Sequence, residues 1–251
     1  MKERVICIIP ARYDSSRFPG KALHRFNDKP LLQHAHDRAQ ETGQFDAVFV
    51  ATDSEKIARA TRDFGGRVII TSSSCRSGSD RVAEASAKLK ADIIVNIQAD
   101  EPFLPVSAVS APLEMMKRNS RILSATTATR IRKKDELYDE NVVKVVLDRR
   151  GNALYFSRSL IPFPRVYFAD DDLAGTRDVY FYKHIGVYLF RKRFMARFLA
   201  MKTSYLEHTE KLEQLRILEA GYRMKVAVIA EDSPCVDTLS DIQRLQRHTP
   251  H

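Results

Sequence analysis

The stretch VICIIP at residues 5–10, followed at once by ARYDSSRFPGK at 11–21, decides the fold. Its apolar run from Val5 to Ile9 is rich in β-branched residues, which predicts a strand buried on both faces, as in a parallel sheet. The loop after it carries Arg12, Arg17 and Lys21 among serines, a proline and a glycine. Open α/β sheets bind ligands at the carboxyl ends of their strands, where these cations suit phosphate. The loop therefore predicts a site for a polyanion such as a triphosphate.

Strands and helices alternate outward from this stretch. Helices are predicted at 29–43 and 54–66, between strands at 5–10, 46–53 and 67–71, and this βαβαβ order indicates a doubly wound parallel sheet. We expect the α/β class: a Rossmann-like, three-layer α/β/α fold with a mostly parallel mixed sheet. Further helices are predicted at 82–91, about 107–119, 204–223 and 239–248, and further strands within 92–105, 122–128, 183–194 and 225–238.

Residues 141–162 have a different pattern. They form two strand-like runs joined at Gly151 and Asn152, which predicts an antiparallel hairpin. The segment after it is aromatic and polar, without a clear period. We expect one domain over 1–251, with an inserted excursion over about 141–182.

Composition narrows the class of protein. The net charge of +9 comes from 41 basic and 32 acidic residues that are interspersed, unlike a dedicated nucleic-acid surface. Three widely spaced cysteines without a CxxC pair argue against a disulfide framework or a zinc site. No apolar run is long enough to span a membrane, and the first strand follows the N-terminus without a cleavage site. A cytoplasmic protein is the simplest interpretation, with neither nucleic acid nor membrane insertion expected.

Two common nucleotide-binding patterns do not fit the opening loop. A dinucleotide fold would have GxGxxG at the first turn, which residues 10–21 lack. A P-loop would have GxxxxGK[ST], whereas Gly20 and Lys21 are followed by Ala22, and residue 15 is not glycine. What remains is a loop that holds phosphate with side-chain cations as well as backbone.

Other polar groups are predicted at the same sheet edge. The loop SSSCRSGSDR (72–81) either contributes to a site or supplies helix caps through Ser79 and Asp80, and both interpretations stay open. After the next strand, alternation would place Asn96, Gln98 and Asp100 on one face.

A set of motifs covers essentially the whole chain: PARYDSSRFPGK, ATD at 51–53, SGSDR at 77–81, NIQADEP at 96–102, VKVVLD and ALYFSR within 143–158, KHIGVY at 183–188, LEQLR at 212–216 and VDT at 236–238. In this order and spacing, the motifs resemble those of a known family, the CMP-Kdo synthetases or 3-deoxy-manno-octulosonate cytidylyltransferases. The first motif is shared with other sugar nucleotidyltransferases. The set together is specific.

The resemblance implies a reaction. CMP would pass from CTP to the anomeric hydroxyl of the eight-carbon acidic sugar Kdo, releasing pyrophosphate, with Mg²⁺ as cofactor and lipopolysaccharide biosynthesis as its purpose. It also implies a homodimer with its surface within 153–182. The residues are consistent with this chemistry, since displacement at phosphorus needs alignment and charge neutralisation more than a covalent nucleophile.

The resemblance also implies site residues. Lys21, Arg17, Asp100 and Asp237 would be catalytic, and the two aspartates would hold the metal. The CTP contacts would come from Arg12, Ser15, Arg17, Lys21, Thr52, Asp53, Ser77, Gly78, Arg81 and Gln98. The sugar contacts would come from Gln98, Arg158, His184, Tyr188, Glu213 and Gln214.

Each assignment has a structural alternative. Surface Arg and Lys residues commonly form weak salt bridges only, and Asp237 is equally suited to capping the last helix. His184 fits a satisfied core histidine, Tyr188 fits packing, and Glu213 and Gln214 fit a solvated helix face. At the level of function, the alternatives are a cytidylyltransferase for 8-amino-Kdo or a sialic acid, a non-catalytic sugar-nucleotide binder, and, from the pI alone, a nucleic-acid binder.

The chain departs from the family pattern in three places. Ala99 stands where glycine is usual before the aspartate, which matters if that backbone needs φ > 0. Cys75 and Ser79 stand where the family commonly has histidine and threonine. The segment SPCVDT lacks the glycine often found before VDT.

Overall fold

The structure is a computed structural model that describes residues 2–13, 20–165, 173 and 180–233. The chain divides into two compact units, and each is discontinuous in sequence. Unit 1 comprises Met1–Val106, Arg191–Leu199 and Ser233–His251, and unit 2 comprises Ser107–Phe190 and Ala200–Asp232. We describe each unit by itself. The single-domain interpretation of the sequence stays a prediction.

Unit 1 is built around β1 (Val5–Pro10), whose six residues are all buried, as the apolar run predicts. This strand pairs in parallel with β6 (Ile93–Ile97) on one side and with β4 (Ala47–Thr52) on the other. Strand β4 in turn pairs in parallel with β5 (Arg67–Ile70), which gives the order β6-β1-β4-β5. The doubly wound parallel sheet is therefore confirmed, and its central strand is the one that opens the chain.

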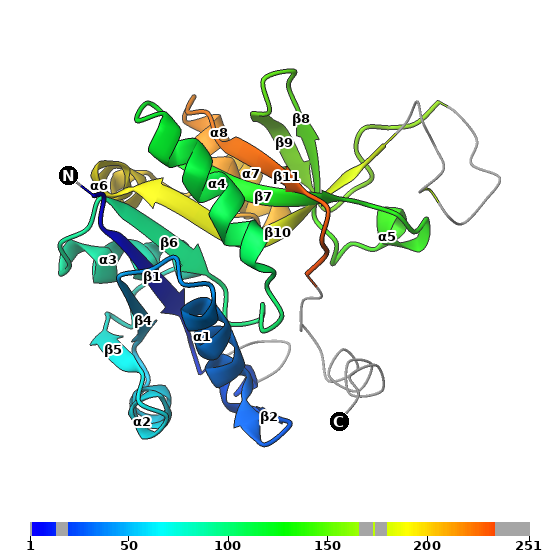
Figure 1. Cartoon of the computed structure of the whole chain (residues 1–251). Coiled ribbons are helices and arrows are strands. Elements are labelled where there is room, and N and C mark those ends of the chain that lie inside the picture. The colour runs from blue at the N-terminus through cyan, green and yellow to red at the C-terminus, as the bar shows by residue number, and fades with distance from the viewer. Residues whose placement is uncertain (1, 14–19, 166–172, 174–179, 234–251) are drawn as a thin grey trace. The chain divides into compact units, whose positions relative to one another are not determined.

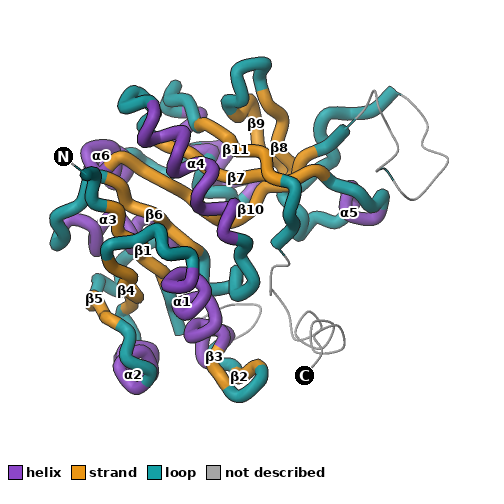
Figure 2. The backbone as a smooth tube through the Cα atoms, viewed as in Figure 1, coloured by secondary structure: helices purple, strands orange, loops and turns teal. Residues whose placement is uncertain are grey.

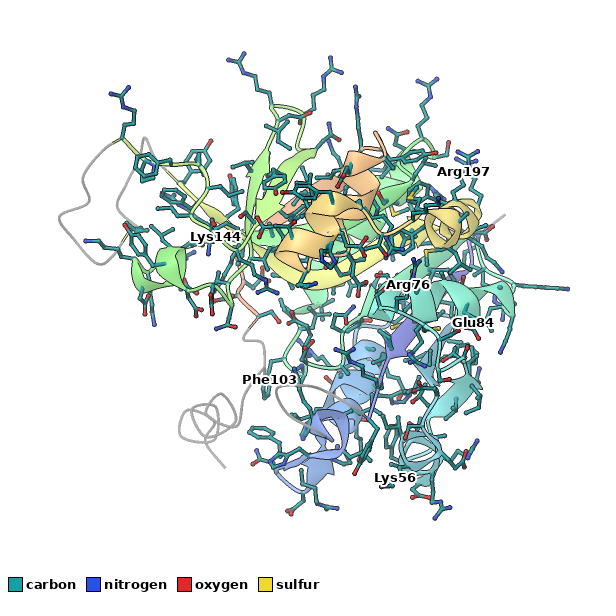
Figure 3. The ribbon with its side chains drawn as sticks, turned by 180° about the vertical axis from the view of Figure 1, so that it is seen from behind. Lys56, Arg76, Glu84, Phe103, Lys144 and Arg197 are labelled. Atoms are coloured by element: carbon teal, nitrogen blue, oxygen red, sulfur yellow. The ribbon has the colours of Figure 1, made fainter. Side chains whose placement is uncertain are left out.

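Three helices connect these strands: α1 (Leu31–Glu41), α2 (Glu55–Asp63) and α3 (Gly78–Ala87). The path moves from β1 through β4 to β5 and then returns past β1 to β6. Because crossovers between parallel strands are right-handed, this reversal places α3 on the face opposite to α1. Figure 1 shows α1 in front of the sheet, and α3 is nearer the viewer in Figure 3.

Helix α3 begins at Gly78, four residues before the predicted start at 82. The hydroxyl of Ser77 accepts a hydrogen bond from the backbone N–H of Asp80 at 3.1 Å, so Ser77 is the N-cap. The interpretation of Ser79 and Asp80 as caps is thus corrected, because both lie in the first helical turn. The pattern read from 82 onward missed this turn, which is polar in sequence but buried in the fold.

The sequence analysis did not identify three small elements of unit 1. They are η1 (Lys21–Leu23) and the two-residue strands β2 (Arg25–Phe26) and β3 (Lys29–Pro30), which pair with each other. Gly20 precedes η1 with φ of +72°, a conformation that glycine adopts without steric cost. Helix α6 (Lys192–Ala200) lies mostly in unit 1.

Unit 2 contains a mixed arrangement of strands. β7 (Ser124–Arg130) pairs in parallel with β11 (Lys225–Ile229) and antiparallel with β10 (Tyr182–Arg191). The predicted hairpin is confirmed as β8 (Lys144–Leu147) and β9 (Ala153–Ser157), which lie side by side in Figure 2. Gly151 in its turn has φ of +72°.

The helices of unit 2 include one correction. α4 (Val106–Arg118) matches its prediction, and the four-residue α5 (Asp135–Tyr138) was not predicted. The single helix predicted over 204–223 is wrong, because the segment forms α7 (Tyr205–Glu210) and α8 (Leu215–Glu219). Between them Lys211 has φ of +57°, in the left-handed region, which ends the helical hydrogen bonding.

Two strong polar contacts fix this pair of short helices. The guanidinium of Arg216 forms a buried, two-pronged ion pair with Glu207. The carboxylate of Glu219 accepts hydrogen bonds from the backbone N–H groups of Tyr205 and Leu206, which lowers its pKa. These tertiary contacts outweigh the helical period that the sequence displays across 204–223.

Within the described part of the chain, no helix is long and apolar enough to cross a membrane. The final helix predicted at 239–248 lies outside the described residues.

The left-handed conformation of Lys211 can be tested, because a glycine there should change the free energy of unfolding in opposite directions for two short helices and for one continuous helix. Lys211→Gly should raise the free energy of unfolding by roughly 0.5–1 kcal/mol, because glycine adopts φ > 0 without steric cost. If 204–223 were one helix, the same change would cost roughly 1 kcal/mol. Urea denaturation of wild type and variant measures the sign. Arg59→Gly, in the middle of α2, is the matched control and should be destabilising.

Candidate functional site

The carboxyl edge of the unit 1 sheet gathers opposite charges. The ammonium of Lys21, in η1 after β1, lies 2.8 Å from Oδ2 of Asp100, in the turn after β6. Both side chains are partly buried, with 14% and 29% of their surfaces exposed, so the pair is less screened than a surface salt bridge. These are the two residues of the predicted catalytic set that the structure describes, and it brings them into contact.

A second ion pair lies at the same edge. The guanidinium of Arg81, which is buried on α3, lies 3.1 Å from Asp53, just after β4. Its other amino group donates to the hydroxyl of Thr71, at 2.5 Å. Thr52 is buried at the end of β4, where its hydroxyl accepts from the N–H of Ser54. Arg81 thus ties α3 to the ends of β4 and β5.

An amide relay connects β6 to the start of α3. The side chain of Gln98 donates to Oδ1 of the fully buried Asn96 at 3.0 Å, and Asn96 donates to the hydroxyl of Ser79 at 3.3 Å. Gly78, the first residue of α3, lies beside this relay, because a Cβ at Gly78 would lie 3.4 Å from Oε1 of Gln98, in ordinary van der Waals contact. The side chains of Asn96 and Gln98 are in contact, as expected of residues on one face. The expectation that strand alternation continues to Asp100 is wrong, because the strand ends before it. Strand β6 ends at Ile97, and Asp100 is carried by the following turn.

Of the remaining residues predicted to bind CTP or metal, one is described by the structure and the others are not. Arg12 follows β1 with an exposed side chain, and it has no ion pair within the described ranges. Ser15, Arg17 and Asp237 lie outside the described residues. Also within those ranges, no group of three or more His, Cys, Asp or Glu side chains is arranged to hold a metal ion.

Unit 2 holds a second cluster, made of predicted sugar residues. His184 on β10 lies between two aromatic rings, 5.3 Å from that of Phe156 and 5.1 Å from that of Tyr188. The hydroxyl of Tyr188 donates to Oε1 of Gln214 at 3.2 Å. Gln214 is 3% exposed, and its Nε2 is buried without a hydrogen-bond partner in the described structure. A buried amide donor without a partner costs free energy, so this nitrogen marks a position where a ligand oxygen would be favoured.

The protonation of His184 follows from its surroundings. Burial lowers its pKa to about 3, so the ring is neutral at physiological pH. The hydroxyl of Thr126 donates its one hydrogen to the carbonyl of Val187 at 2.6 Å, and it lies 2.8 Å from Nε2 of His184. Nε2 must therefore carry the hydrogen and donate to Thr126, which leaves Nδ1 as an acceptor.

Arg158, at the end of β9, is held by backbone oxygens. Its Nε donates to the carbonyl of Glu210 at 3.1 Å, and its Nη1 donates to that of Glu140 at 2.8 Å. The carboxylate of Glu210 also accepts from the N–H of Arg158 and from the hydroxyl of Ser157. Arg158 has no carboxylate ion pair within the described structure, so its positive charge is available to an acid. Glu213 is partly buried and precedes Gln214.

Several residues of these clusters were not predicted from the sequence. Glu84, Glu101, Glu210, Thr126 and Lys144 all hold predicted site residues or their neighbours. Lys144 is fully buried, where desolvation lowers its pKa, and donates to the carbonyls of Asp139 and Val142. The one available signal was the spacing of Asp80 and Glu84, which places both carboxylates on one face of a helix.

Comparison with known proteins places this chain in a family. A cytidylyltransferase family model matches residues 6–227. The chain is similar to the 3-deoxy-manno-octulosonate cytidylyltransferases of Geotalea daltonii, at 43% identity over 96% of each chain, and of Pseudoalteromonas atlantica, at 41% identity over 95% of each.

Solved structures agree. The chain is similar to a CMP:2-keto-3-deoxy-manno-octonic acid synthetase complexed with CTP, with 35% identity and a TM-score of 0.87 over 98% of each chain. A 4-diphosphocytidyl-2C-methyl-D-erythritol synthase, at 15% identity and a TM-score of 0.62, shares the fold alone. The chain belongs to the 3-deoxy-manno-octulosonate cytidylyltransferases, the CMP-Kdo synthetases, within the cytidylyltransferase family.

Proposed function

We propose that this chain transfers CMP from CTP to the anomeric hydroxyl of Kdo, giving CMP-Kdo and pyrophosphate. The observation that carries the proposal is the contact of Lys21 with Asp100 at the carboxyl edge of the sheet, in a chain of this family. A cation and a carboxylate side by side are what a triphosphate and its counter-ion need. The family's printed names supply the substrates, and the two clusters supply chemistry that suits them.

The unit 1 cluster suits a triphosphate. Phosphoryl transfer depends on holding the phosphorus in line with its attacking oxygen and on neutralising charge on the phosphate oxygens. Lys21 is placed to neutralise charge near the transferred phosphorus, and the exposed Arg12 extends the positive surface. Arg17 and Ser15, between them in sequence, would complete this group. The N-terminus of α3 with Gly78 offers backbone N–H groups to the nucleotide.

The donor set suits Mg²⁺. This ion is usually held by one or two carboxylates together with phosphates and water, and Asp100 supplies one partly exposed carboxylate. We assign Asp100 and Asp237 as its ligands. When bound, the ion would neutralise phosphate charge and orient the leaving pyrophosphate.

One contact supports bringing these aspartates together. The hydroxyl of Ser233 donates to the buried carboxylate of Glu101 at 2.6 Å. Glu101 follows Asp100 directly, and Ser233 precedes Asp237 by four residues. Four residues of extended chain span at most about 14 Å, and on this ground we propose that Asp237 acts together with Asp100.

The unit 2 cluster suits a polyhydroxylated acid. The charge of Arg158 would pair with the sugar carboxylate, since guanidinium–carboxylate hydrogen bonds are the strong kind. The unpartnered Nε2 of Gln214 would donate a hydrogen bond to one sugar hydroxyl. Nδ1 of His184 would accept a hydrogen bond from another. Tyr188 and Glu213 would add further polar contacts, and Gln98, which belongs to unit 1, stays a sugar contact implied by the family resemblance. A neutral imidazole suits this role because it does not compete with Arg158 for the acid.

Three broader properties accompany the proposal. We place the reaction in the cytoplasm, in lipopolysaccharide biosynthesis, and in a homodimer. The dimer surface would include the exposed Phe163 and Tyr180, which are 80% and 51% accessible and lie within the excursion. Large exposed aromatic side chains of this kind are typical of protein interfaces.

A substrate panel tests the function. Pyrophosphate release from CTP and Mg²⁺ should be fastest with Kdo, slower with 8-amino-Kdo and slowest with a sialic acid. A preference for another sugar would reassign the acceptor. CTP binding without release for any sugar would instead indicate a non-catalytic sugar-nucleotide binder and would overturn the proposal.

Asp100→Asn should abolish Mg²⁺-dependent turnover, with a loss of about 10²-fold or more, because the amide removes the charge that this hard cation prefers. Steady-state pyrophosphate release over a magnesium titration measures it. Asp46→Asn, beside the start of β1 and so at the opposite end of the strands, serves as a stability control. A rate near that of wild type would remove Asp100 from the metal site.

His184 makes stability depend on pH. Its pKa is about 3 when folded and 6.5 unperturbed, so its contribution is present above pH 6.5 and is lost as the pH falls toward 3. From pH 6.5 to 5 the loss is at most about 2 kcal/mol, less with residual solvation. Urea denaturation at pH 7 and at pH 5 measures the change. The free energy of unfolding should fall less between these two pH values in His184→Gln than in wild type. His208→Gln, on exposed surface, should behave as wild type, and equal losses in all three proteins would contradict the assignment.

A further inference from the structure

The carboxylate of Glu84, on α3, contacts two points of the loop 72–77. Its Oε1 accepts from the backbone N–H of Ser72 at 2.9 Å, and its Oε2 accepts from the thiol of Cys75 at 3.2 Å. The hydroxyls of Ser72 and Ser74 are 2.7 Å apart inside the same loop. One helix side chain therefore fixes both the start and the middle of this loop.

Other residues of α3 fix the loop at its ends. Arg81 donates to Thr71 before it, and Ser77 caps the helix after it. Arg76 also pairs with Asp80 at 2.9 Å. Figure 3 shows Arg76 and Glu84 on the same side of the molecule, over α3. Hydrogen bonds from side chains of helix α3 thus hold the loop along its length, and Glu84 makes those to residues 72 and 75.

Cys75 is suited to donate to this carboxylate. Burial, with the hydrogen bond to Glu84, raises the pKa of its thiol to about 11, so it keeps its hydrogen at neutral pH. A thiol is a weak donor, and a serine hydroxyl of similar size is a stronger one. Histidine, which the family resemblance implies at this position, also offers an N–H. The departure at Cys75 therefore preserves a donor to Glu84.

We propose that Glu84 and Cys75 are positioning residues for CTP, which hold the loop 72–77 in the conformation that presents Ser77 and Gly78 to the nucleotide. This inference rests on the proposed function. Neither side chain needs to touch the nucleotide. Loosening the loop should weaken the binding of CTP and leave the acceptor sugar and the chemical step largely unchanged.

Steady-state pyrophosphate release with CTP or sugar varied tests the proposal in Glu84→Ala, Cys75→Ala and Cys75→Ser. Glu84→Ala should raise KM for CTP about tenfold or more, because it removes both hydrogen bonds to the loop. Cys75→Ala should raise it about threefold, because it removes only the bond from a weak thiol donor. Cys75→Ser should keep the wild-type KM for CTP, because the serine hydroxyl replaces the thiol as donor. The KM for sugar should stay unchanged, and kcat should fall less than about threefold. Glu55→Ala, a surface ion-pair glutamate on α2, is the matched control and should leave both KM values unchanged.

The outcomes are separable. An unchanged KM for CTP in a folded Glu84→Ala, or equal rises for both substrates, would overturn the proposal. If Glu84→Ala does not fold, the Cys75→Ala and Cys75→Ser pair decides, because only a positioning role predicts rescue by the hydroxyl. If wild type releases no pyrophosphate with any sugar, the proposed function fails. Calorimetric titration of CTP into the same variants then tests the loop independently.

Discussion

The parallel pairing of β1 with both β4 and β6 is the constraint on which unit 1 depends. Because these strands run in the same direction, the loops that follow them leave at one edge, and each loop carries charge. Burial of all six residues of β1 fixes its position between its neighbours. Lys21, Asp53 and Asp100, which follow these strands, are therefore held at the same edge of the sheet. The hydrophobic effect thereby gathers groups whose own interactions would not have assembled them.

The charges at this edge are paired in two ways. Arg81 is buried and bonded to Asp53 and Thr71, so it serves the architecture that carries the nucleotide loop. Lys21 and Asp100 are more exposed, and the proposed reaction would engage them separately, the cation with phosphate and the carboxylate with metal. In unit 2 the arrangement differs, because Arg158 is bonded to carbonyl oxygens and keeps its charge for an acid.

Much of this could be predicted from the sequence, because β-branched runs and strand–helix alternation determine the sheet locally. The helix expected over 204–223 was wrong, since the apolar period persists while Glu207, Arg216 and Glu219 fix two shorter helices through contacts far apart in sequence. The site residues came mainly from family motifs. Their supports, such as Glu84 and Glu210, carry no motif of their own, and only folding reveals which polar group each one meets.

Two departures from the family pattern, at Ala99 and Cys75, have a physical account, whereas the segment SPCVDT lies almost entirely outside the described residues. Among the described residues other than glycine, those with positive φ are Asn27, Asp28 and Lys211, so Ala99 lies outside the left-handed region and its Cβ causes no backbone strain. Cys75 keeps a hydrogen-bond donor toward Glu84. Neither change removes a group that the proposed chemistry uses.

A crystal structure with CTP and Mg²⁺ tests the central claim most directly. The account predicts that the nucleotide lies at the carboxyl edge of β1 and β6, with Lys21 released from Asp100 to the phosphates and Asp100 on the metal. A nucleotide bound elsewhere, or bound with the Lys21–Asp100 pair intact, would contradict it.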